Sequence, residues 1–450
     1  MKIATVFILT LGLGSIALWW TFHRPAKATG RPSYVVISGD TAGWITPCGC
    51  TANQSGGLLR RGTFIRQLRA TEDNVIYADV GGAVAGDSPY LRAKFEAVMQ
   101  GEIEMGLSAH NLGGPEALMG PAYLRDLASR LHAPLISANT RDVSGKSLVE
   151  PARVVVAGGR RIALIGVVSP SFATDQVRID QPKTAILSTL ASIRGTYDAV
   201  IVLAYVSEQE LTQLASEIPE ADAIIGGHTR QSISPRAIGR VLMGAATNKG
   251  KFLIQLDVPP KGSTQRWEGK AVEMNTSFAD DQQQLVNLQQ FQHLLGEKDF
   301  PARDSGLVEP LLPNAPADYR VAGSASCSFC HQESDQTWTH SAHAQAWEVL
   351  KPRGFQSDPY CLQCHTTGYG LPGGFDSLQQ TAALVNVGCE SCHGPSQAHA
   401  RDPKTRTTFT AAEQCVRCHD QENSPNFGYS AHWDRIRHGS NVGGQRQVRS

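Results

Sequence analysis

The sequence has no excess charge of either sign, since its 450 residues include 41 Lys and Arg against 41 Asp and Glu. A balanced chain gives no overall electrostatic reason to bind nucleic acid or an anionic membrane. Cysteine is nearly absent before residue 327, where Cys48 and Cys50 stand alone. Disorder is excluded as well, because 41% of the residues are hydrophobic and 18% are charged. A chain of this length is expected to form two or three domains.

The other eight cysteines lie between residues 327 and 419, in four units of the form Cys-x-x-Cys-His. Two thiols at this spacing can each form a thioether to one porphyrin, and the following His can then ligate the iron. Paired Cys-x-x-Cys units also form zinc sites, but zinc does not require a His after every second Cys. The sequence therefore predicts four covalently attached c-type haems. The attachment residues and proximal ligands are Cys327, Cys330, His331, Cys361, Cys364, His365, Cys389, Cys392, His393, Cys415, Cys418 and His419.

Further histidines in the same region are candidates for the second axial position of each iron. They are His340, His343, His399, His432 and His438. Two His ligands favour electron transfer because no iron position is open for substrate, whereas an open iron permits small-molecule chemistry. His340 and His432 can equally be plain surface histidines.

Residues 319–440 resemble the tetrahaem cytochrome c family whose known member takes electrons from hydroxylamine oxidation. The matching stretches are Trp338-Thr-His-Ser-Ala-His343, Val387-Gly-Cys389-Glu-Ser-Cys392-His393-Gly-Pro395 and Asn423-Ser-Pro425. The resemblance implies distal ligation by His343, His399 and His438, with either three or four bis-His haems. It implies an electron carrier that acts between redox partner proteins.

The chain begins with an apolar run from Ile3 to Phe22, and about 20 such residues can span a bilayer. Ala26-Lys27-Ala28 is typical of a signal-peptide cleavage site, whereas Trp19-Trp20 and the length of the run favour an uncleaved anchor. Residues 1–28 are thus a signal peptide or a membrane anchor. Both alternatives predict a periplasmic or other extracytoplasmic protein, with or without an anchor in the inner membrane.

Residues 33–277 alternate short apolar runs with helix-like segments, which is typical of a layered α/β domain. The expected strands are Tyr34–Ser38, Asn74–Ala78, Pro134–Ala138, Arg161–Val168, Ala199–Ala204, Ala223–Ile225, Val241–Met243 and Lys251–Val258. The expected helices are Leu91–Gln100, Pro121–Leu131, Lys183–Ile193 and Glu208–Ile218. Polar residues follow several of these strands, at the edge where open α/β sheets bind ligands.

These strand ends resemble the calcineurin-like metallophosphoesterases, in particular the periplasmic 5′-nucleotidases, which bind two metal ions. Asp40 and His228 match metal ligands of that family, but other ligand positions are replaced in Gly81-Gly82, Gly113-Gly114 and Ala204-Tyr205. Two ligands cannot hold a two-metal clamp. The resemblance therefore implies the fold with a degenerate site. An additional metal ion and phosphoesterase activity in this domain stay open as alternatives.

Cys48 and Cys50 follow Asp40 in Pro47-Cys48-Gly49-Cys50, ahead of Gly56-Gly57-Leu58-Leu59-Arg60-Arg61. The two motifs resemble a nucleotidase-like subgroup in which the second Cys is sometimes selenocysteine. The pair is a dithiol redox centre, a pair of metal ligands or an inert disulfide. The two arginines are expected on a solvated helix face, with bidentate anion binding as the alternative. Histidines without a partner motif are expected to be ordinary residues; they are His110, His132 and His293.

Residues 278–318 are expected to join the two domains, first as a helix over Asp281–Leu295 and then as a Pro-rich, semi-rigid connector. The tetrahaem domain, residues 319–450, has weak periodicity, which predicts short helices around haem faces, with Gln336–Leu350 as the best helix. The chain as a whole is expected to carry electrons between redox proteins. The alternative for this domain is a haem enzyme acting on a small nitrogen or sulfur compound at a five-coordinate iron.

Overall fold

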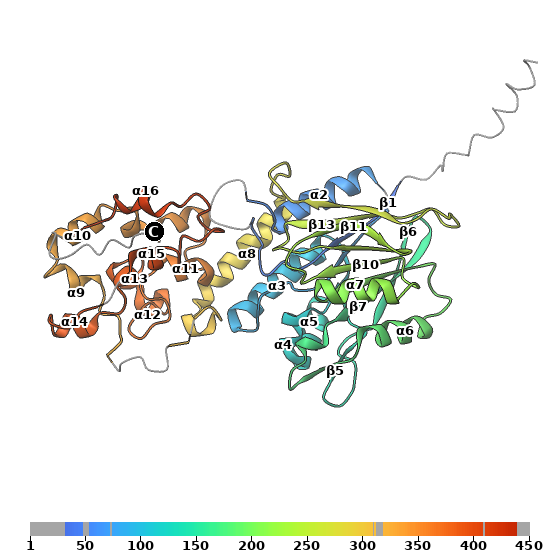
Figure 1. Ribbon diagram of the computed structural model, residues 1–450, viewed down its shortest axis with the longest axis horizontal. Coiled ribbons are helices and arrows are strands. Elements are labelled where there is room, and N and C mark those ends of the chain that lie inside the picture. Colours follow the sequence, from blue (N-terminus) through green and yellow to red (C-terminus); the bar gives the residue numbers. More distant parts are fainter. Residues whose placement is uncertain are drawn as a thin grey trace, which may run out of the picture.

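The computed structural model describes residues 32–47, 54–72, 74–308, 310–311, 318–407 and 410–438. The apolar N-terminal run and the pair of Cys48 and Cys50 lie outside these ranges. Within them, no helix is both long enough and apolar enough to cross a membrane. Figure 1 shows a large α/β region and, beyond α8 (Gln282–Lys298, yellow), a smaller region of short helices.

Two mixed six-stranded sheets form the centre of the α/β region. Their strand orders are β14-β13-β1-β2-β3-β4 and β11-β12-β10-β9-β7-β6. The strands β1 to β4 of the first sheet and β7, β9, β10 and β12 of the second run parallel, and antiparallel pairing occurs at one edge of the first sheet and at both edges of the second. A short pair, β5 with β8, stands apart. The bounds are β1 Ser33–Ser38, β2 Asn74–Asp79, β3 Leu107–Asn111, β4 Leu135–Ile136, β5 Thr140–Asp142, β6 Ala152–Ala157, β7 Arg160–Val168, β8 Val177–Ile179, β9 Ala199–Tyr205, β10 Ala223–Gly227, β11 Ile233–Ile238, β12 Val241–Ala245, β13 Phe252–Asp257 and β14 Glu268–Glu273.

Helices cover the outer face of each sheet, so the region has four layers (Figure 1). Successive strand residues point to opposite faces. Val36 accordingly packs against the first helical layer, while Val35 and Ile37 enter the core between the sheets. The helices on the first sheet are α2 (Leu58–Thr71), α3 (Pro89–Glu104), α5 (Gly120–Leu131) and α8, and those on the second are α6 (Pro182–Ser192) and α7 (Glu208–Glu217). The predicted layered α/β architecture is confirmed, and every expected strand is present.

α8 lies in the predicted connector but packs on α2 and α3 of the first helical layer. Its Gln284 and Asn287 donate side-chain hydrogen bonds to the carbonyls of Gly101 and Ala97, at 3.1 and 3.0 Å. Asp281 caps the helix by accepting from the backbone N–H groups of its first turn. This helix therefore extends the α/β region towards the short helices.

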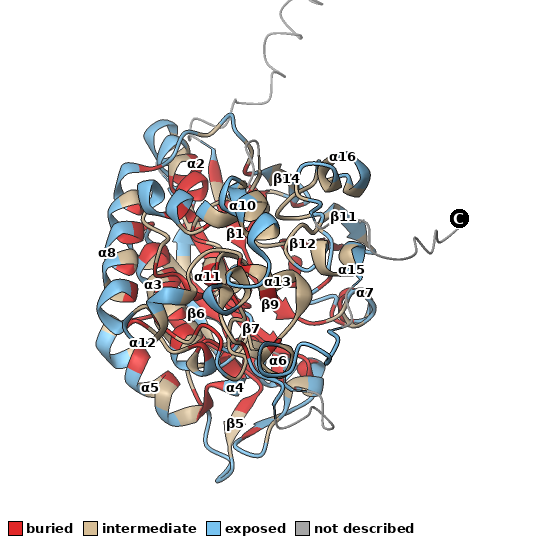
Figure 2. Ribbon diagram, turned by 90° about the vertical axis from the view of Figure 1, so that its left-hand side faces the viewer, coloured by how far each residue is buried: buried red, intermediate tan, exposed pale blue. Residues whose placement is uncertain are grey.

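The C-terminal region consists of short helices, as expected. They are α9 (Ser324–Ser328), α10 (Gln332–Thr339), η3 (Ala342–Gln345), η4 (Glu348–Arg353), α11 (Pro359–His365), α12 (Leu378–Thr381), η5 (Ala382–Leu384), α13 (Cys389–His393), α14 (Gln397–Arg401), α15 (Ala411–Cys415) and α16 (Tyr429–Trp433). In Figure 2, where this region faces the viewer, it is mostly intermediate or exposed, and central strands behind it such as β1 and β9 are buried.

The prediction of one helix over Gln336–Leu350 is wrong, because α10 ends at Thr339 and two 3₁₀ segments follow. Contacts with a distant segment explain the break. Trp338 donates its indole N–H to the carbonyl of Val387 at 2.8 Å, and the N–H of Val387 donates to the carbonyl of His343 at 3.1 Å. Tertiary hydrogen bonds thus replace those that a continuous helix would make.

The two regions are in direct contact. Tyr90 of α3 donates a hydrogen bond of 2.6 Å to the buried carboxylate of Asp358. The rings of Trp44 and Tyr360 meet edge to face with centroids 5.1 Å apart. Lys249 forms an ion pair with Glu422 across the same boundary.

Candidate haem-binding site

Each Cys-x-x-Cys-His unit is built on a single helical turn. α11 and α13 contain the whole second and third units, and α9 and α15 contain the first Cys of the other two. In the first and fourth units the N–H of the His donates to the carbonyl of the first Cys, at 2.9 and 2.8 Å. Residues three and four apart on a helix share one face. The turn therefore presents both thiols and the His on the same side.

Three of the four proximal histidines face a second His across a gap. Ring centroids are 6.0 Å apart for His331 and His399, 6.2 Å for His419 and His343, and 6.1 Å for His393 and His438. Two metal–nitrogen bonds of about 2 Å, with the distance from each nitrogen to its ring centre, separate two ligating imidazoles by roughly 6 Å. These pairs therefore fit one iron each, with one ligand from an attachment unit and one from a distant helix or loop.

Hydrogen bonds at Nδ1 orient several of these rings. Nδ1 donates to the carbonyl of Thr405 in His399, of Ile436 in His438, and of Ala346 in His365. A carbonyl can only accept, so the proton is on Nδ1 and Nε2 carries the free lone pair. This second contact is the usual device that orients a ligating imidazole.

Burial favours the neutral, ligating form of the same rings. It is the main cause of a lowered pKa in His343, in His393 and in His419. Neighbouring imidazoles lower these pKa values further: His419 acts on His343, and His438 acts on His393. The residues present therefore fit a haem at these units, since uncharged imidazole nitrogens and paired thiols converge there.

His365 of the second unit differs from the other proximal histidines. Among the described residues no second imidazole ring stands opposite it. His432 packs on the ring of Phe427 at a centroid distance of 5.1 Å, and Phe427 in turn stacks on His419 at 4.6 Å. His340 is exposed, and its Nδ1 donates to the carbonyl of Gln336 within its own helix. The second unit is thus the one that the structure leaves with a single His.

The four units adjoin in an order that differs from the sequence. The thiols of Cys327 and Cys389 are neighbours, and so are those of Cys364 and Cys418. α13 also packs against α9 and α15. A cavity of about 190 Å³ is lined by cysteines of the second, third and fourth units and by His343 and His419. The spatial order is therefore first, third, fourth, second.

Glu390 organises the third unit, and the sequence did not single it out as functional. Its carboxylate is buried and accepts hydrogen bonds from the N–H groups of Ala322, Gly323 and Ser396, at 2.8, 2.7 and 2.7 Å. It ties the segment before the first unit to the segment after the third. The one sequence feature that could have pointed to Glu390 is its position between the attachment cysteines Cys389 and Cys392. A charged residue is rarely buried without partners, and Glu390 has three.

In the α/β region, aromatic rings occupy the space between the two matched phosphoesterase residues. Tyr205 packs on His228 with centroids 5.2 Å apart, and its hydroxyl donates to Asp40 at 3.4 Å. A side chain at Gly82, where the related family has its bridging Asp, would place its Cβ 2.5 Å from the Tyr205 ring. At Gly114 an added Cβ would lie 2.2 Å from the ring of Phe172. The rings of Tyr205 and Phe172 therefore fit only because Gly82 and Gly114 have no side chains at these positions.

Arg61 and His110 lie in a buried network, and Arg60 is buried as well, so the expected solvated position of the two arginines is wrong. Arg61 is fully buried, donates to Glu102 at 2.9 Å and to Thr41 at 2.7 Å. His110 contacts the other oxygen of Glu102 at 2.9 Å. Asp79, Glu102 and His110 offer ligand atoms within 4.8 Å of one another, which makes them a candidate metal site. Arg61 already places a cation among these carboxylates.

The pKa shifts in this network indicate that the positive groups Arg61 and His110 compensate the buried carboxylates of Glu102 and Asp79. Burial works against ionisation of His110, but its hydrogen bond to Glu102 raises its pKa well above the usual value. Burial and the charge of Glu102 raise the pKa of Asp79 to about 6. The network therefore has an internal source of positive charge at neutral pH.

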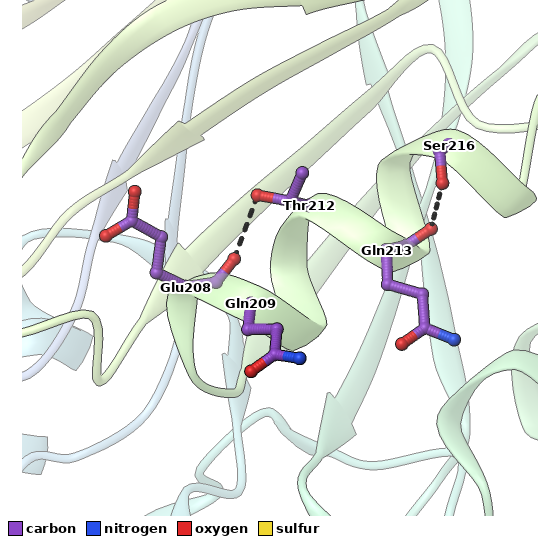
Figure 3. Close-up of a pocket in the computed structure, with 5 residues that line it drawn as sticks. All are labelled: Glu208, Gln209, Thr212, Gln213 and Ser216. Carbon is purple, nitrogen blue, oxygen red and sulfur yellow. Dashed lines mark hydrogen bonds between the residues drawn. The ribbon is translucent and has the colours of Figure 1, made fainter.

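A further hollow lies on one side of α7, lined by Glu208, Gln209, Thr212, Gln213 and Ser216 (Figure 3). Thr212 and Ser216 donate to the carbonyls of Glu208 and Gln213 within the same helix, at 2.9 and 2.8 Å. These hydroxyls are engaged with their own helix and converge on no common point. The hollow is ordinary helix surface.

Comparison with known proteins separates the chain into the same two regions. The family described as cytochrome c554 and c-prime matches residues 326–394. Cytochrome c-554 of Nitrosomonas europaea is 31% identical, over 26% of this chain and 64% of that protein. Snake venom 5′-nucleotidase of Gloydius brevicauda is 26% identical, over 52% of this chain and 45% of that protein. The chain thus spans less than two thirds of either relative.

The solved 5′-nucleotidase precursor of Thermus thermophilus has a TM-score of 0.53 at 18% identity and covers 79% of this chain and 73% of its own. Such a likeness shows a shared fold. The similarity of the C-terminal region to cytochrome c-554 and the metallophosphoesterase-like fold of the α/β region are both confirmed.

Proposed function

We propose that the chain is an extracytoplasmic tetrahaem c-type cytochrome that passes electrons between redox partner proteins. The observation that carries this proposal is the set of three His pairs at centroid distances of 6.0, 6.1 and 6.2 Å. Two His ligands close both axial positions, which suits electron transfer and excludes substrate from the iron. When bound, the haems supply one-electron redox couples. The chain holds and orients them with its thiols and imidazoles.

The order in which the units adjoin supports a route through the region. The first unit lies at one end, the third and fourth lie in the middle, and the second contacts the α/β region through Tyr360. We propose that electrons enter and leave at the first and second units. One partner would dock near α9, and the other near the boundary with the α/β region.

Spectroscopy of the holoprotein tests the ligand set. We expect four haems by pyridine haemochrome analysis, and three low-spin ferric signals by electron paramagnetic resonance. His343→Ala should convert one low-spin signal to high-spin, because it removes one member of a pair. His340→Ala is the matched control, three residues away on the same segment, and should change nothing. A low-spin count that His343→Ala leaves intact would contradict the proposal.

The second unit favours one further candidate function. Since no second imidazole faces His365 among the described residues, an iron held there has an open position. An open position permits small-molecule chemistry, such as reduction or oxidation of a nitrogen or sulfur compound. Carbon monoxide should then bind one ferrous haem in four. Failure to bind, with four low-spin signals, would remove this candidate.

We further propose that the α/β region is a degenerate phosphoesterase that serves as a docking module. The rings of Tyr205 and Phe172 support this proposal, because they lie where metal ligands of the related family would project. Metal-dependent phosphate release from a nucleoside monophosphate would overturn it. Cys48 and Cys50 lie outside the described residues. If they exchange electrons with the haems, replacing both by Ser should slow haem reduction by the native donor.

A further inference from the structure

A cavity of about 300 Å³ lies at the boundary between the two regions. The α/β region contributes Trp44, from the loop after β1, and Lys94 of α3. α8 contributes Phe291, and the short-helix region contributes Arg353, Cys361 and His365. Figure 1 shows α3 and α8 at the end of the α/β region that faces α11. Neither region forms this cavity alone.

One attachment thiol and the proximal ligand of the second unit, Cys361 and His365, line this cavity. Both also line the neighbouring cavity of about 190 Å³, where the second attachment thiol, Cys364, lies. His365 also has its Nδ1 proton engaged with the carbonyl of Ala346, so its Nε2 is free. The remaining wall is largely aromatic and aliphatic, as in Phe291 and Trp44. Such a wall suits the face of a porphyrin.

Two cations on the lining lack carboxylate partners within the described part of the chain. Lys94 donates to the hydroxyl of Tyr90 at 2.8 Å and lies over the ring of Tyr360, at 5.3 Å from its centroid. Arg353 has an exposed side chain, and its backbone carbonyl accepts a hydrogen bond from Gln292 at 2.8 Å. The one carboxylate among the described lining residues, Asp358, is buried and accepts from Tyr90 at 2.6 Å. The cavity therefore carries net positive charge.

We infer that the α/β region completes the pocket of the haem held by Cys361, Cys364 and His365, with Lys94 and Arg353 paired to its two propionates. A porphyrin is an apolar disc with two carboxylates on one edge, and this cavity combines an apolar wall with two cations that no carboxylate of the described residues neutralises. Charge-assisted hydrogen bonds from Lys and Arg are the strong contacts available to a carboxylate. The inference rests on the proposed haem attachment, and it gives the phosphoesterase-like region a role in setting the properties of one haem.

Potentiometry of the holoprotein tests the inference. Lys94→Gln and Arg353→Gln should each lower the midpoint potential of this haem, because each removes a positive charge next to a centre that gains positive charge on oxidation. The double variant should change its reduction equilibrium on the order of tenfold, which is about 59 mV for a one-electron couple. The redox wave of this haem is the one that His365→Met raises, since a Met ligand raises the potential.

Lys351→Gln is the matched control. Lys351 lies on the same short helix as Arg353 but pairs with Glu348 at 2.8 Å and does not line the cavity. An equal shift in the control, or shifts spread over all four haems, would overturn the inference. It would also fail if added phosphate or sulfite bound with an affinity that depends on Lys94 while the potential stayed unchanged, because the cavity would then hold a free anion. Haem content is measured separately, so loss of covalent haem would instead count against the proposed function.

Discussion

The α/β region and the short-helix region differ in what fills their interiors. Strand residues such as Ile201 and Ile225 are fully buried between or behind the sheets. Among the described residues from 318 to 438, the buried hydrophobic side chains are Val321, Ala346, Leu350, Leu362 and Phe375. So small an apolar core cannot offset the conformational entropy of ordering such a segment. The first region has a core of its own side chains, and in the second the proposed haems would supply much of the apolar interior.

The largest expected effect comes from preventing haem attachment. Replacing the eight attachment cysteines with Ser should leave the α/β region folded and the short-helix region unfolded, because the second loses its apolar partners. Limited proteolysis should then digest the chain beyond residue 318 and leave a resistant N-terminal fragment. A protease-resistant C-terminal fragment in the haem-free protein would show that its side chains suffice.

The next effect tests the α/β region alone. Arg61→Leu should lower the free energy of unfolding of that region by about 3–5 kcal/mol, because it removes one of the two positive groups that the buried Glu102 and Asp79 face and leaves only His110. Urea unfolding followed by far-ultraviolet circular dichroism measures the change, with the haem absorbance spectrum expected to stay unaltered. Arg178→Leu, at an exposed position, is the control and should cost little. Equal costs for both variants would mean that the buried network adds nothing.

The burial of Arg61 is a feature that local sequence patterns do not predict. The strands were predictable because buried parallel strands are continuous apolar runs, and the haem units because their chemistry requires a fixed local spacing. Burial of Arg61 could not be predicted, since it depends on Glu102, which lies on a different helix. The partner of His331 is His399, far along the chain. Pairings of this kind follow from tertiary contacts, which no local pattern encodes.

Glu390 should matter to the short-helix region as Arg61 does to the other. Glu390→Gln removes the charge that accepts three backbone N–H groups, and we expect a loss of about 2 kcal/mol. Thermal loss of the haem Soret band measures it. Glu413→Gln, on α15 and exposed, is the matched control. If both variants lose the Soret band at the same temperature as the unchanged protein, Glu390 adds nothing to the stability that the haems give this region.

The two regions should also differ in their response to pH. In the α/β region the hydrogen bond to Glu102 keeps the pKa of His110 well above its usual value, so the folded chain holds a proton that the unfolded chain releases above about pH 6.5. The free energy of unfolding should therefore fall as pH rises through that window. His110→Gln should abolish this slope in urea titrations, while His293→Gln, at an exposed position, should preserve it. A slope unchanged by His110→Gln would place its origin elsewhere.

The smallest effect concerns the boundary between the two regions. Lys249 and Glu422 form an ion pair that is partly exposed, with side chains 31% and 27% accessible. A double-mutant cycle of Lys249→Gln and Glu422→Gln should give a coupling of about 0.2–1 kcal/mol, because water screens such pairs. The unfolding transitions of the two regions should also lie further apart in denaturant concentration in the variants, because the contact that couples them is weaker. Zero coupling at low salt would mean that Tyr90, Trp44 and their partners hold the regions together without this pair.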